Sequence, residues 1–432
     1  MRRTRWGTAM IGVCCAAMLL SPVSAVSAAP RHGLADPVPP RGLAAEHAKL
    51  WRAILPTPAG DPFFDAWPTR AAAAGEVIEH RDVSVVAVAQ MPVPIRQAIQ
   101  LKFGTRDSAG APSFGTATML VPAADWQDGD RPVVVHSLPI NSMGIRCTPG
   151  FHMAHGTPDA MTGFNLVPPA TVQALERGYA VLIPDHEGPR MAYAEPRVAG
   201  HLVLDGVRAA RAALGPAFDD SRYALVGYSG GGLASYAATM LLPEYAPELR
   251  SVVAGAALGG IMTDYRRIAR LFDGRIESGI LLSVVLAFAR EHPEILGAMN
   301  ELGAFVASSP VKDICGGRQA LLGAVGVPLE LFSKYDKPLD SDLADRIFRD
   351  VDLRGRASPV PLYLFHAVND PWIPVAGATD LYREQCGFGV AATLRLSPGE
   401  HLIGSLITFP GVMDWLDDVL KHGVVPVGCR RH

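Results

Sequence analysis

The chain has 432 residues, of which 39 are basic and 42 acidic, so its formal net charge at pH 7 is −3. Hydrophobic residues make up 49% of the sequence, which is enough for a large buried core. The absence of a basic run argues against a nucleic-acid-binding protein, and beyond the first 28 residues no apolar stretch reaches the length of a membrane span.

The N-terminus has the pattern of an export signal. Three arginines among the first five residues precede an apolar run, Ala9 to Leu20, and small residues follow it. This run is too short to span a bilayer comfortably, although an uncleaved membrane anchor is the alternative. We expect cleavage after Ala28. A mature chain without residues 1–28 loses three basic and no acidic residues, so its net charge is −6.

Four cysteines remain after this cleavage, and an even, sparse set in an exported protein predicts two disulfides. None of them belongs to a C-x-x-C pair or has a histidine at ligand spacing, so we expect no zinc site. We also expect no other metal and no cofactor. These cysteines are Cys147, Cys315, Cys386 and Cys429.

Strand and helix patterns then alternate along the chain. Residues 98–108 and 113–123 predict an antiparallel hairpin at a sheet edge. Short apolar strands and amphipathic helices follow, and this alternation predicts a mostly parallel, doubly wound α/β sheet. The expected strands are 131–137, 180–188, 222–228 and 251–260, and the expected helices are 168–179, 197–214 and 230–245.

The alternation stops after the fourth of these strands. Residues 258–354 have helical patterns and no clear strand, so we expect a helical cap or lid inserted into the sheet domain. A strand at 360–370, a helix at 376–386, a strand at 391–397 and a helix at 411–420 resume the fold. The expected organisation is a signal peptide (1–28), a leader with the first helices (29–80), the first part of the core (81–257), the cap (258–354) and the second part of the core (355–432).

The segment Gly-Tyr-Ser-Gly-Gly, with Ser229 at its centre, lies where the third of the parallel strands gives way to a helix. It fits the pattern G-x-S-x-G, in which a sharp turn exposes a nucleophilic serine above the sheet. Because side chains two positions either side of the serine would collide in that turn, glycine is required there. An ordinary tight turn is the alternative, so the motif needs support from the rest of the chain.

A serine nucleophile needs a base, and the base needs an acid that orients it. In α/β sheets that carry such a serine turn, the three residues follow along the chain in the order serine, acid, histidine. Asp370 directly follows a buried strand, and His401 follows the next one, so we expect both to join Ser229. The alternative interpretations are that Asp370 only forms a turn and that His401 only starts a helix. We expect His136 and His366 to be packed core residues.

An acyl-transfer site also needs N–H donors for the developing oxyanion. One is expected from the amide of Gly230, at the start of a helix whose dipole favours negative charge. The second is expected from the loop after the strand at 131–137, which lacks the HGGG run of many lipases and esterases.

Several motifs resemble those of the secretory lipases of the lipase A type. They are RCTPGF, IPDHEGP, GYSGGGLAS, HAVNDPWIP and PGEHL, and the likeness extends from Pro92 to the end of the chain. The resemblance implies an α/β-hydrolase with a helical lid that hydrolyses carboxylic esters of medium or long acyl chains. It also implies a Ser229–His401–Asp370 triad, and a second oxyanion donor at Asn141, where the family commonly has aspartate. It further implies the disulfides Cys147–Cys315 and Cys386–Cys429.

The sequence therefore predicts a secreted serine esterase or lipase acting on fatty-acid esters of the triacylglycerol type. The partners expected are a lipid or ester substrate and a lipid interface that the cap contacts transiently, with no stable membrane anchor. An acyltransferase or a peptidase with the same triad is the alternative, and a non-catalytic binding protein on a hydrolase scaffold is a third. The apolar cap favours a fatty acyl substrate over a charged peptide.

Overall fold

The computed structural model describes residues 37–40, 42–157, 169–215, 218, 220–424 and 426–432. The expected signal peptide and its cleavage after Ala28 lie outside the described residues.

A mixed sheet organises the chain and confirms the predicted α/β class. Its strands run in the order β1-β2-β3-β5-β4-β6-β7-β8-β9-β10. The pairings from β1 to β5 are antiparallel and those from β5 to β10 are parallel. The strands are β1 (Val77–Asp82), β2 (Ile95–Arg106), β3 (Pro112–Pro122), β4 (Val133–Ser137), β5 (Ala180–Pro184), β6 (Tyr223–Tyr228), β7 (Val253–Gly259), β8 (Leu362–Ala367), β9 (Ala392–Ser397) and β10 (Cys429–Arg431).

The predicted hairpin, β2 with β3, is present, but it does not form the edge of the sheet. β1 pairs outside it, and β10 adds the opposite edge beside β9. Neither edge strand has the apolar alternation of a half-buried strand, because β1 is rich in charged residues and β10 is short and exposed. Both were therefore missing from the sequence-based prediction.

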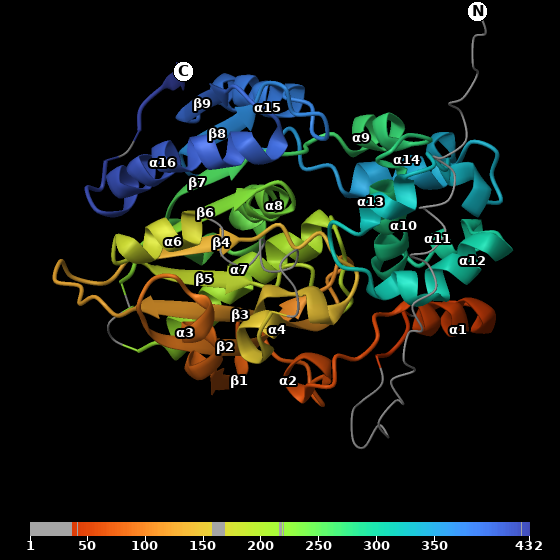
Figure 1. Ribbon diagram of the computed structural model, residues 1–432, viewed down its shortest axis with the longest axis horizontal. Helices are drawn as coiled ribbons and strands as arrows, with labels where there is room; N and C mark the ends of the chain where they lie inside the picture. Colours follow the sequence, from red (N-terminus) through yellow and green to blue (C-terminus); the bar gives the residue numbers. More distant parts are fainter. Residues whose placement is uncertain (1–36, 41, 158–168, 216–217, 219, 425) are drawn as a thin grey trace, which may run out of the picture. The chain divides into compact units, whose positions relative to one another are not determined.

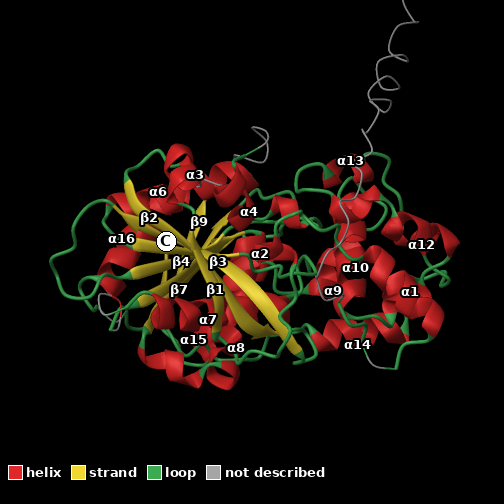
Figure 2. Cartoon of the chain, turned by 90° about the horizontal axis from the view of Figure 1, so that it is seen from below, coloured by secondary structure: helices red, strands yellow, loops and turns green. Residues whose placement is uncertain are grey.

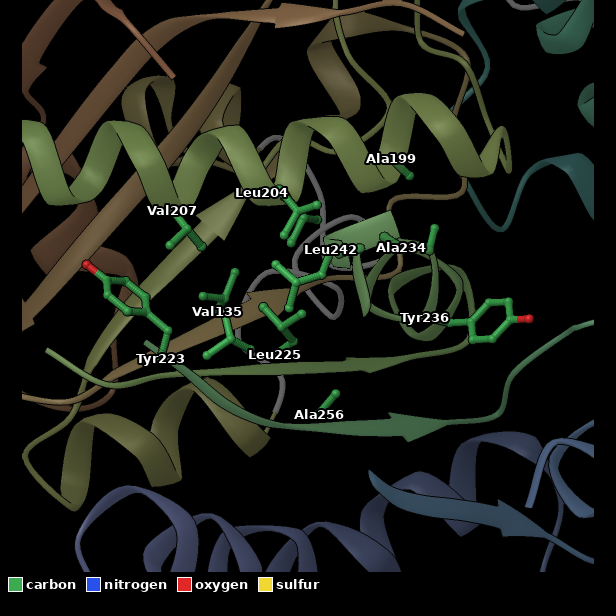
Figure 3. Packing of buried hydrophobic residues seen from close by; sticks show 14 of the residues in the cluster. Val135, Ala199, Leu204, Val207, Tyr223, Leu225, Ala234, Tyr236, Leu242 and Ala256 are labelled. Carbon is green, nitrogen blue, oxygen red and sulfur yellow. The ribbon is translucent and has the colours of Figure 1, made fainter. Parts of the chain in front are cut away.

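Helices cover both faces of the sheet (Figure 2). Two clusters of buried apolar side chains lie between these helices and the sheet. In Figure 3, Leu204 and Val207 of one helix and Leu242 of another point toward Val135 and Leu225 in the sheet. One face carries α7 (Pro196–Ala213), α8 (Gly230–Tyr245) and α15 (Ala376–Gly387), and the other carries α3 (Ser84–Gln90), α4 (Pro149–His155), α6 (Pro169–Glu176) and α16 (His401–Leu420).

The last helix, α16, is longer than predicted, because it begins at His401. The Glu400 side chain accepts the backbone N–H groups of Leu402 and Ile403, which caps the helix at this point. His401 is therefore also the histidine at a helix start that the alternative interpretation described. Its place in the first turn is what brings it to the sheet edge near Ser229.

Residues 258–354, here called the cap segment, are helical and lie in the chain between β7 and β8 (Figure 1). They have a core cluster of their own, which also contains Trp51 of α1. The helices are α1 (Ala45–Ile54), α2 (Pro62–Asp65), α9 (Tyr265–Phe272), α10 (Ser278–Glu291), α11 (Ile295–Ala298), α12 (Glu301–Ser308), α13 (Gln319–Gly323) and α14 (Asp342–Asp350), with short 3-10 helices at Ile145–Cys147, Pro247–Ser251, Pro310–Asp313, Leu329–Phe332 and Pro338–Asp340.

The N-terminal helix α1 packs with the cap segment, beside α10, α11 and α12 (Figure 1). The Trp51 indole N–H donates to the backbone oxygen of Arg290 at 2.9 Å, and Trp51 is fully buried. The segment expected to contain a leader and the first helices (29–80) therefore contributes, through α1, to the core of the cap segment.

Both disulfides implied by the resemblance are present. Cys147–Cys315 joins the sheet domain to the cap segment, and Cys386–Cys429 joins α15 to the strand β10. Among the described helices, none combines the length and the apolar character needed to cross a bilayer.

Candidate active site

Ser229 lies in a strained turn between β6 and α8. Its backbone has φ 57° and ψ −125°, a region that residues with side chains rarely occupy and that costs about 1–3 kcal/mol. Its N–H donates to the backbone oxygen of Gly259 at 2.9 Å, which holds the turn against β7. Such strain at a serine in this position is typical of a nucleophile exposed at the end of a strand.

The four glycines around Ser229 are required because other atoms occupy the space of a side chain. A Cβ at any of them would approach a neighbouring atom to within 2.4 Å, closer than real Cβ atoms come. The contacts would be Gly227 with the Gly231 oxygen (2.1 Å), Gly230 with Asn141 Oδ1 (2.0 Å), Gly231 with the Ser137 oxygen (1.9 Å) and Gly232 with the Gly259 oxygen (2.4 Å).

Asp370 and His401 form a buried acid–base pair. The His401 Nδ1 atom lies 2.5 Å from Asp370 Oδ2, and the other carboxylate oxygen accepts the backbone N–H groups of Trp372 and Ile373 at 2.9 Å each. Burial alone would raise the pKa of Asp370, but hydrogen bonds from His366 and His401 hold it well below its usual range. The acid is therefore ionised at neutral pH and oriented toward the imidazole.

The imidazole of His401 borders the same turn as Ser229. Tyr228, which precedes the serine, lies against the ring at a centroid distance of 4.9 Å, and its hydroxyl donates to the His401 backbone oxygen at 2.6 Å. A Cβ at Gly260 would lie 3.1 Å from His401 Cε1, while the neighbouring Gly259 accepts the Ser229 N–H. The structure thus brings the three predicted residues to one place.

The two histidines expected in the core are both buried, but they differ in their surroundings. His136 bonds Thr171 at 2.8 Å, and burial lowers its pKa to about 3, so it stays neutral. His366 donates from Nε2 to the Ile373 backbone oxygen at 2.8 Å, and this nitrogen lies 3.4 Å from Asp370 Oδ2. His366 is therefore packed, as predicted, and also contacts the acid of the pair, which the sequence analysis missed.

Asn141 lies beside the nucleophile, as the resemblance implied. Its φ is 47°, and it lines one cavity together with Ser229 and Gly230. A methyl group on Gly230 would meet the Asn141 side-chain amide. The residues expected to stabilise an oxyanion are thus adjacent.

That cavity extends from Ser229 into the cap segment and encloses about 1410 Å³, its open mouth included. Most of its lining comes from apolar side chains of the cap segment, and none of the described residues that line it is charged. Phe272, Val284, Phe288, Leu339 and Ile347 are examples from α9, α10, α14 and the segment between. Such a cavity suits an extended apolar group.

The Asp-His-Glu segment after β5 is buried at the same edge of the sheet, and the sequence analysis assigned no role to it. Asp185 accepts the Thr116 hydroxyl at 2.6 Å and the Gly150 N–H at 2.9 Å, and burial raises its pKa to about 6. His186 donates from Nε2 to the Leu138 backbone oxygen at 2.7 Å. The run of three consecutive polar residues at a strand end was the available signal.

No cluster of three or more histidine, cysteine or acidic residues that would hold a metal ion occurs within the described ranges.

The family profile described as secretory lipase matches residues 167–424. Lipase 6 of Candida albicans is 27% identical over 402 residues, covering 87% of this chain and 84% of that protein. A probable inactive lipase of Mycobacterium tuberculosis is 30% identical over 387 residues, covering 86% and 84%.

Solved structures share the fold. Candida antarctica lipase A superposes with a TM-score of 0.75 at 23% identity, covering 87% of this chain and 88% of that one. The rice cell wall degrading esterase LipA of Xanthomonas oryzae has a TM-score of 0.60 at 14% identity, with coverages of 81% and 99%. These matches confirm the α/β-hydrolase fold, and the profile, which spans more than half of the sequence, places the chain in the secretory lipase family.

Proposed function

We propose that this chain is a secreted serine esterase or lipase that hydrolyses fatty-acid esters of the triacylglycerol type through an acyl-enzyme. Ser229 is the nucleophile, His401 the general base and Asp370 the acid that orients the base. The observation that carries the proposal is that Ser229, in its strained turn, lines a large cavity without charged residues. A peptide substrate with charged groups would find no partner there.

The proposed reaction begins with attack of the Ser229 Oγ on the ester carbonyl carbon. The His401 Nε2 takes the hydroxyl proton and then gives it to the leaving alcohol, which leaves an acyl-serine. Water, activated by the same nitrogen, hydrolyses this ester and regenerates the serine. The Asp370 carboxylate accepts a hydrogen bond from Nδ1 throughout and stabilises the positive charge that forms on the imidazole.

Negative charge develops on the carbonyl oxygen during both attacks. The N–H of Gly230, at the start of α8, and a donor from Asn141 are proposed to stabilise it. The helix dipole adds to this stabilisation, because the N-terminus of α8 carries partial positive charge.

The cap segment is proposed to bind the acyl chain and to contact a lipid interface transiently as a lid. Large exposed apolar residues support the second role: Phe305 is 70% and Ile276 67% exposed, and both belong to the cap segment. Four apolar residues of α16 next to His401 are about half-exposed as well: Leu402, Ile403, Leu406 and Ile407. Export with cleavage after Ala28 belongs to the same proposal, and the two disulfides support it.

The test is hydrolysis of a p-nitrophenyl ester series from acetate to palmitate by the purified mature chain, with and without an alcohol acceptor. We expect turnover of medium and long chains, with fatty acid as the main product. Absence of turnover on every ester would overturn the proposal. This outcome is part of the test because one relative is named a probable inactive lipase. Predominant transfer to the alcohol would favour the acyltransferase alternative.

A further inference from the structure

We propose that Glu187 is a positioning residue of the active site. Its buried carboxyl holds the turn that carries Asn141 and thereby places the side-chain amide of Asn141 as the second oxyanion donor. This inference rests on the proposed function.

The turn from Leu138 to Met143 has no regular secondary structure to hold it. Asn141 adopts φ 47°, which costs energy for a residue with a side chain and persists only where the surroundings impose it. The contacts of the turn therefore decide where Asn141 points.

Glu187 provides the first of these contacts from the segment after β5. It is 2% exposed, and both of its carboxyl oxygens accept the backbone N–H of Ser142 at 3.3 Å. Burial raises the pKa of Glu187 well above its usual range, while backbone hydrogen bonds from Ser142 and Asn141 and the charge of Arg290 oppose that rise. Glu187 thus holds the turn at the residue that follows Asn141.

The cap segment holds the other polar groups of the turn. Gln319 Nε2 donates to the Asn141 backbone oxygen at 2.9 Å, and the Gly316 N–H donates to Ser142 Oγ at 2.9 Å. Met143 is held at both ends, since its N–H donates to the Ile314 oxygen and its own oxygen accepts from Arg290 Nη1, each at 2.9 Å.

Asn141 is therefore held through its backbone oxygen, by Gln319, and through the N–H of the next residue, by Glu187. Its side-chain amide lies against Gly230: a Cβ there would be 2.0 Å from Oδ1 and 3.7 Å from Nδ2. Because Asn141 and Gly230 line the cavity with Ser229, this amide is the Asn141 group that meets a bound ester. An amide N–H is a suitable oxyanion donor.

Asp185 offers a matched control for Glu187. It is a buried carboxyl in the same segment, 3% exposed, but it bonds Thr116 and Gly150 and has no contact with the turn at Asn141 among its hydrogen bonds. If Glu187 only fills buried space, replacing its carboxyl by an amide should affect kcat as little as the same replacement at Asp185.

The experiment compares Glu187→Gln and Asp185→Asn, each alone and combined with Asn141→Ala, on p-nitrophenyl butyrate. We expect Asn141→Ala to lower kcat about 100-fold, and Glu187→Gln to lower it about 10- to 100-fold with KM nearly unchanged. The double variant Glu187→Gln/Asn141→Ala should be no slower than Asn141→Ala alone, because both changes remove one interaction. Asp185→Asn should change kcat less than about 3-fold, and its effect should multiply with that of Asn141→Ala.

A trifluoromethyl ketone inhibitor, which forms an oxyanion on attack by serine, should lose affinity in Glu187→Gln in step with kcat. The inference is overturned if Asn141→Ala retains wild-type kcat, if Glu187→Gln matches Asp185→Asn, or if its loss multiplies with that of Asn141→Ala. If Glu187→Gln does not fold, Glu187→Asp, which keeps the carboxyl group but withdraws it from the turn, must show the same dependence on Asn141. Failure of the wild-type chain to hydrolyse any ester would instead overturn the proposed function.

Discussion

The sheet edge and the cap segment bring opposite chemistry to one cavity. At the sheet edge, polar side chains bond one another and the backbone, as in the contact of Asp370 with His401. The cap segment lines the cavity with apolar side chains, and its fully buried Arg290 donates to backbone oxygens elsewhere. Reactivity and substrate preference should therefore be separable, with mutations in one region leaving the property of the other intact.

Arg290 also shows how the two regions are joined. Burial lowers its pKa to about 10, which still leaves it charged at neutral pH, and its guanidinium binds oxygens from both regions. Removing it would leave several buried oxygens unpaired. We therefore expect any lid motion to leave the end of α10 in place. The accepting residues are Ile54, Met143, Arg190, Met191 and Lys312.

The strongest test of this separation removes the nucleophile. We expect Ser229→Ala to lower kcat by at least about 10⁴-fold, because no other group at the site can form the acyl-enzyme. Binding of a fatty acid in the cavity, measured by displacement of a fluorescent fatty acid, should stay within about 2-fold of wild type. Retention of more than a tenth of the wild-type rate would show that the turn does not carry the nucleophile.

The buried carboxyl of Asp185 at the sheet edge should make the free energy of unfolding depend on pH. Asp185 has a folded-state pKa of about 6, raised from an ordinary 3.8, so the folded chain binds its proton more tightly than the unfolded chain does. Its contribution is therefore favourable below pH 3.8 and is lost as pH rises through 6. The difference amounts to about 3 kcal/mol.

Asp185→Asn removes this titration. Relative to wild type, its free energy of unfolding should rise between pH 4 and pH 8 by up to about 3 kcal/mol, measured by urea denaturation at each pH. Other groups titrate alike in both proteins, so they cancel from the comparison. A difference that does not change with pH would contradict the burial of an ionisable Asp185.

The cap segment should set chain-length preference. Val284 lines the cavity, so Val284→Trp should shift the preferred p-nitrophenyl ester toward shorter chains, with about a 10-fold loss on palmitate relative to butyrate. Reaction with a small phosphonate should keep its wild-type rate, because the sheet edge is untouched.

Val325→Trp is the matched control, since Val325 belongs to the cap segment but is 81% exposed and does not line the cavity. It should leave the preference unchanged. Equal profiles for both variants would place the acyl-binding site outside the cap segment. Ala287, although on the same helix as Val284, is fully buried and is not among the cavity residues, so tryptophan there would test packing instead.

The smallest expected effect is that of metal removal. Neither region has a described cluster of ligands for a metal, and the proposed mechanism uses none. Treatment with EDTA should leave kcat within experimental error of the untreated protein. Loss of activity that a divalent cation restores would require a different chemistry at the sheet edge.

Local sequence patterns were sufficient to predict the part of the site that contains Ser229, Asp370 and His401. The turn at Ser229 is specified by its own glycines, and Asp370 and His401 each follow a strand that the sequence predicts. Parallel strands present their ends at one edge, so these residues come together as a consequence of the fold.

The other half depends on contacts between distant segments, which a sequence pattern does not encode. Glu187 meets Ser142 from 45 residues away, and Arg290 meets Met143 from 147 residues away. The packing of helix α1 against the cap segment was also not predicted, because the contact of Trp51 with Arg290 spans 239 residues. Such contacts become visible only when the chain is folded.

Covalent trapping tests directly whether Ser229 is the catalytic nucleophile. The mature chain is treated with a p-nitrophenyl alkylphosphonate, and intact mass and peptide mapping locate the adduct while residual ester hydrolysis is followed. We expect one phosphonyl group per chain, on Ser229, with loss of activity proportional to labelling and no labelling of Ser229→Ala. Inactivation with the label on another residue, or full labelling of Ser229 with ester hydrolysis intact, would contradict it.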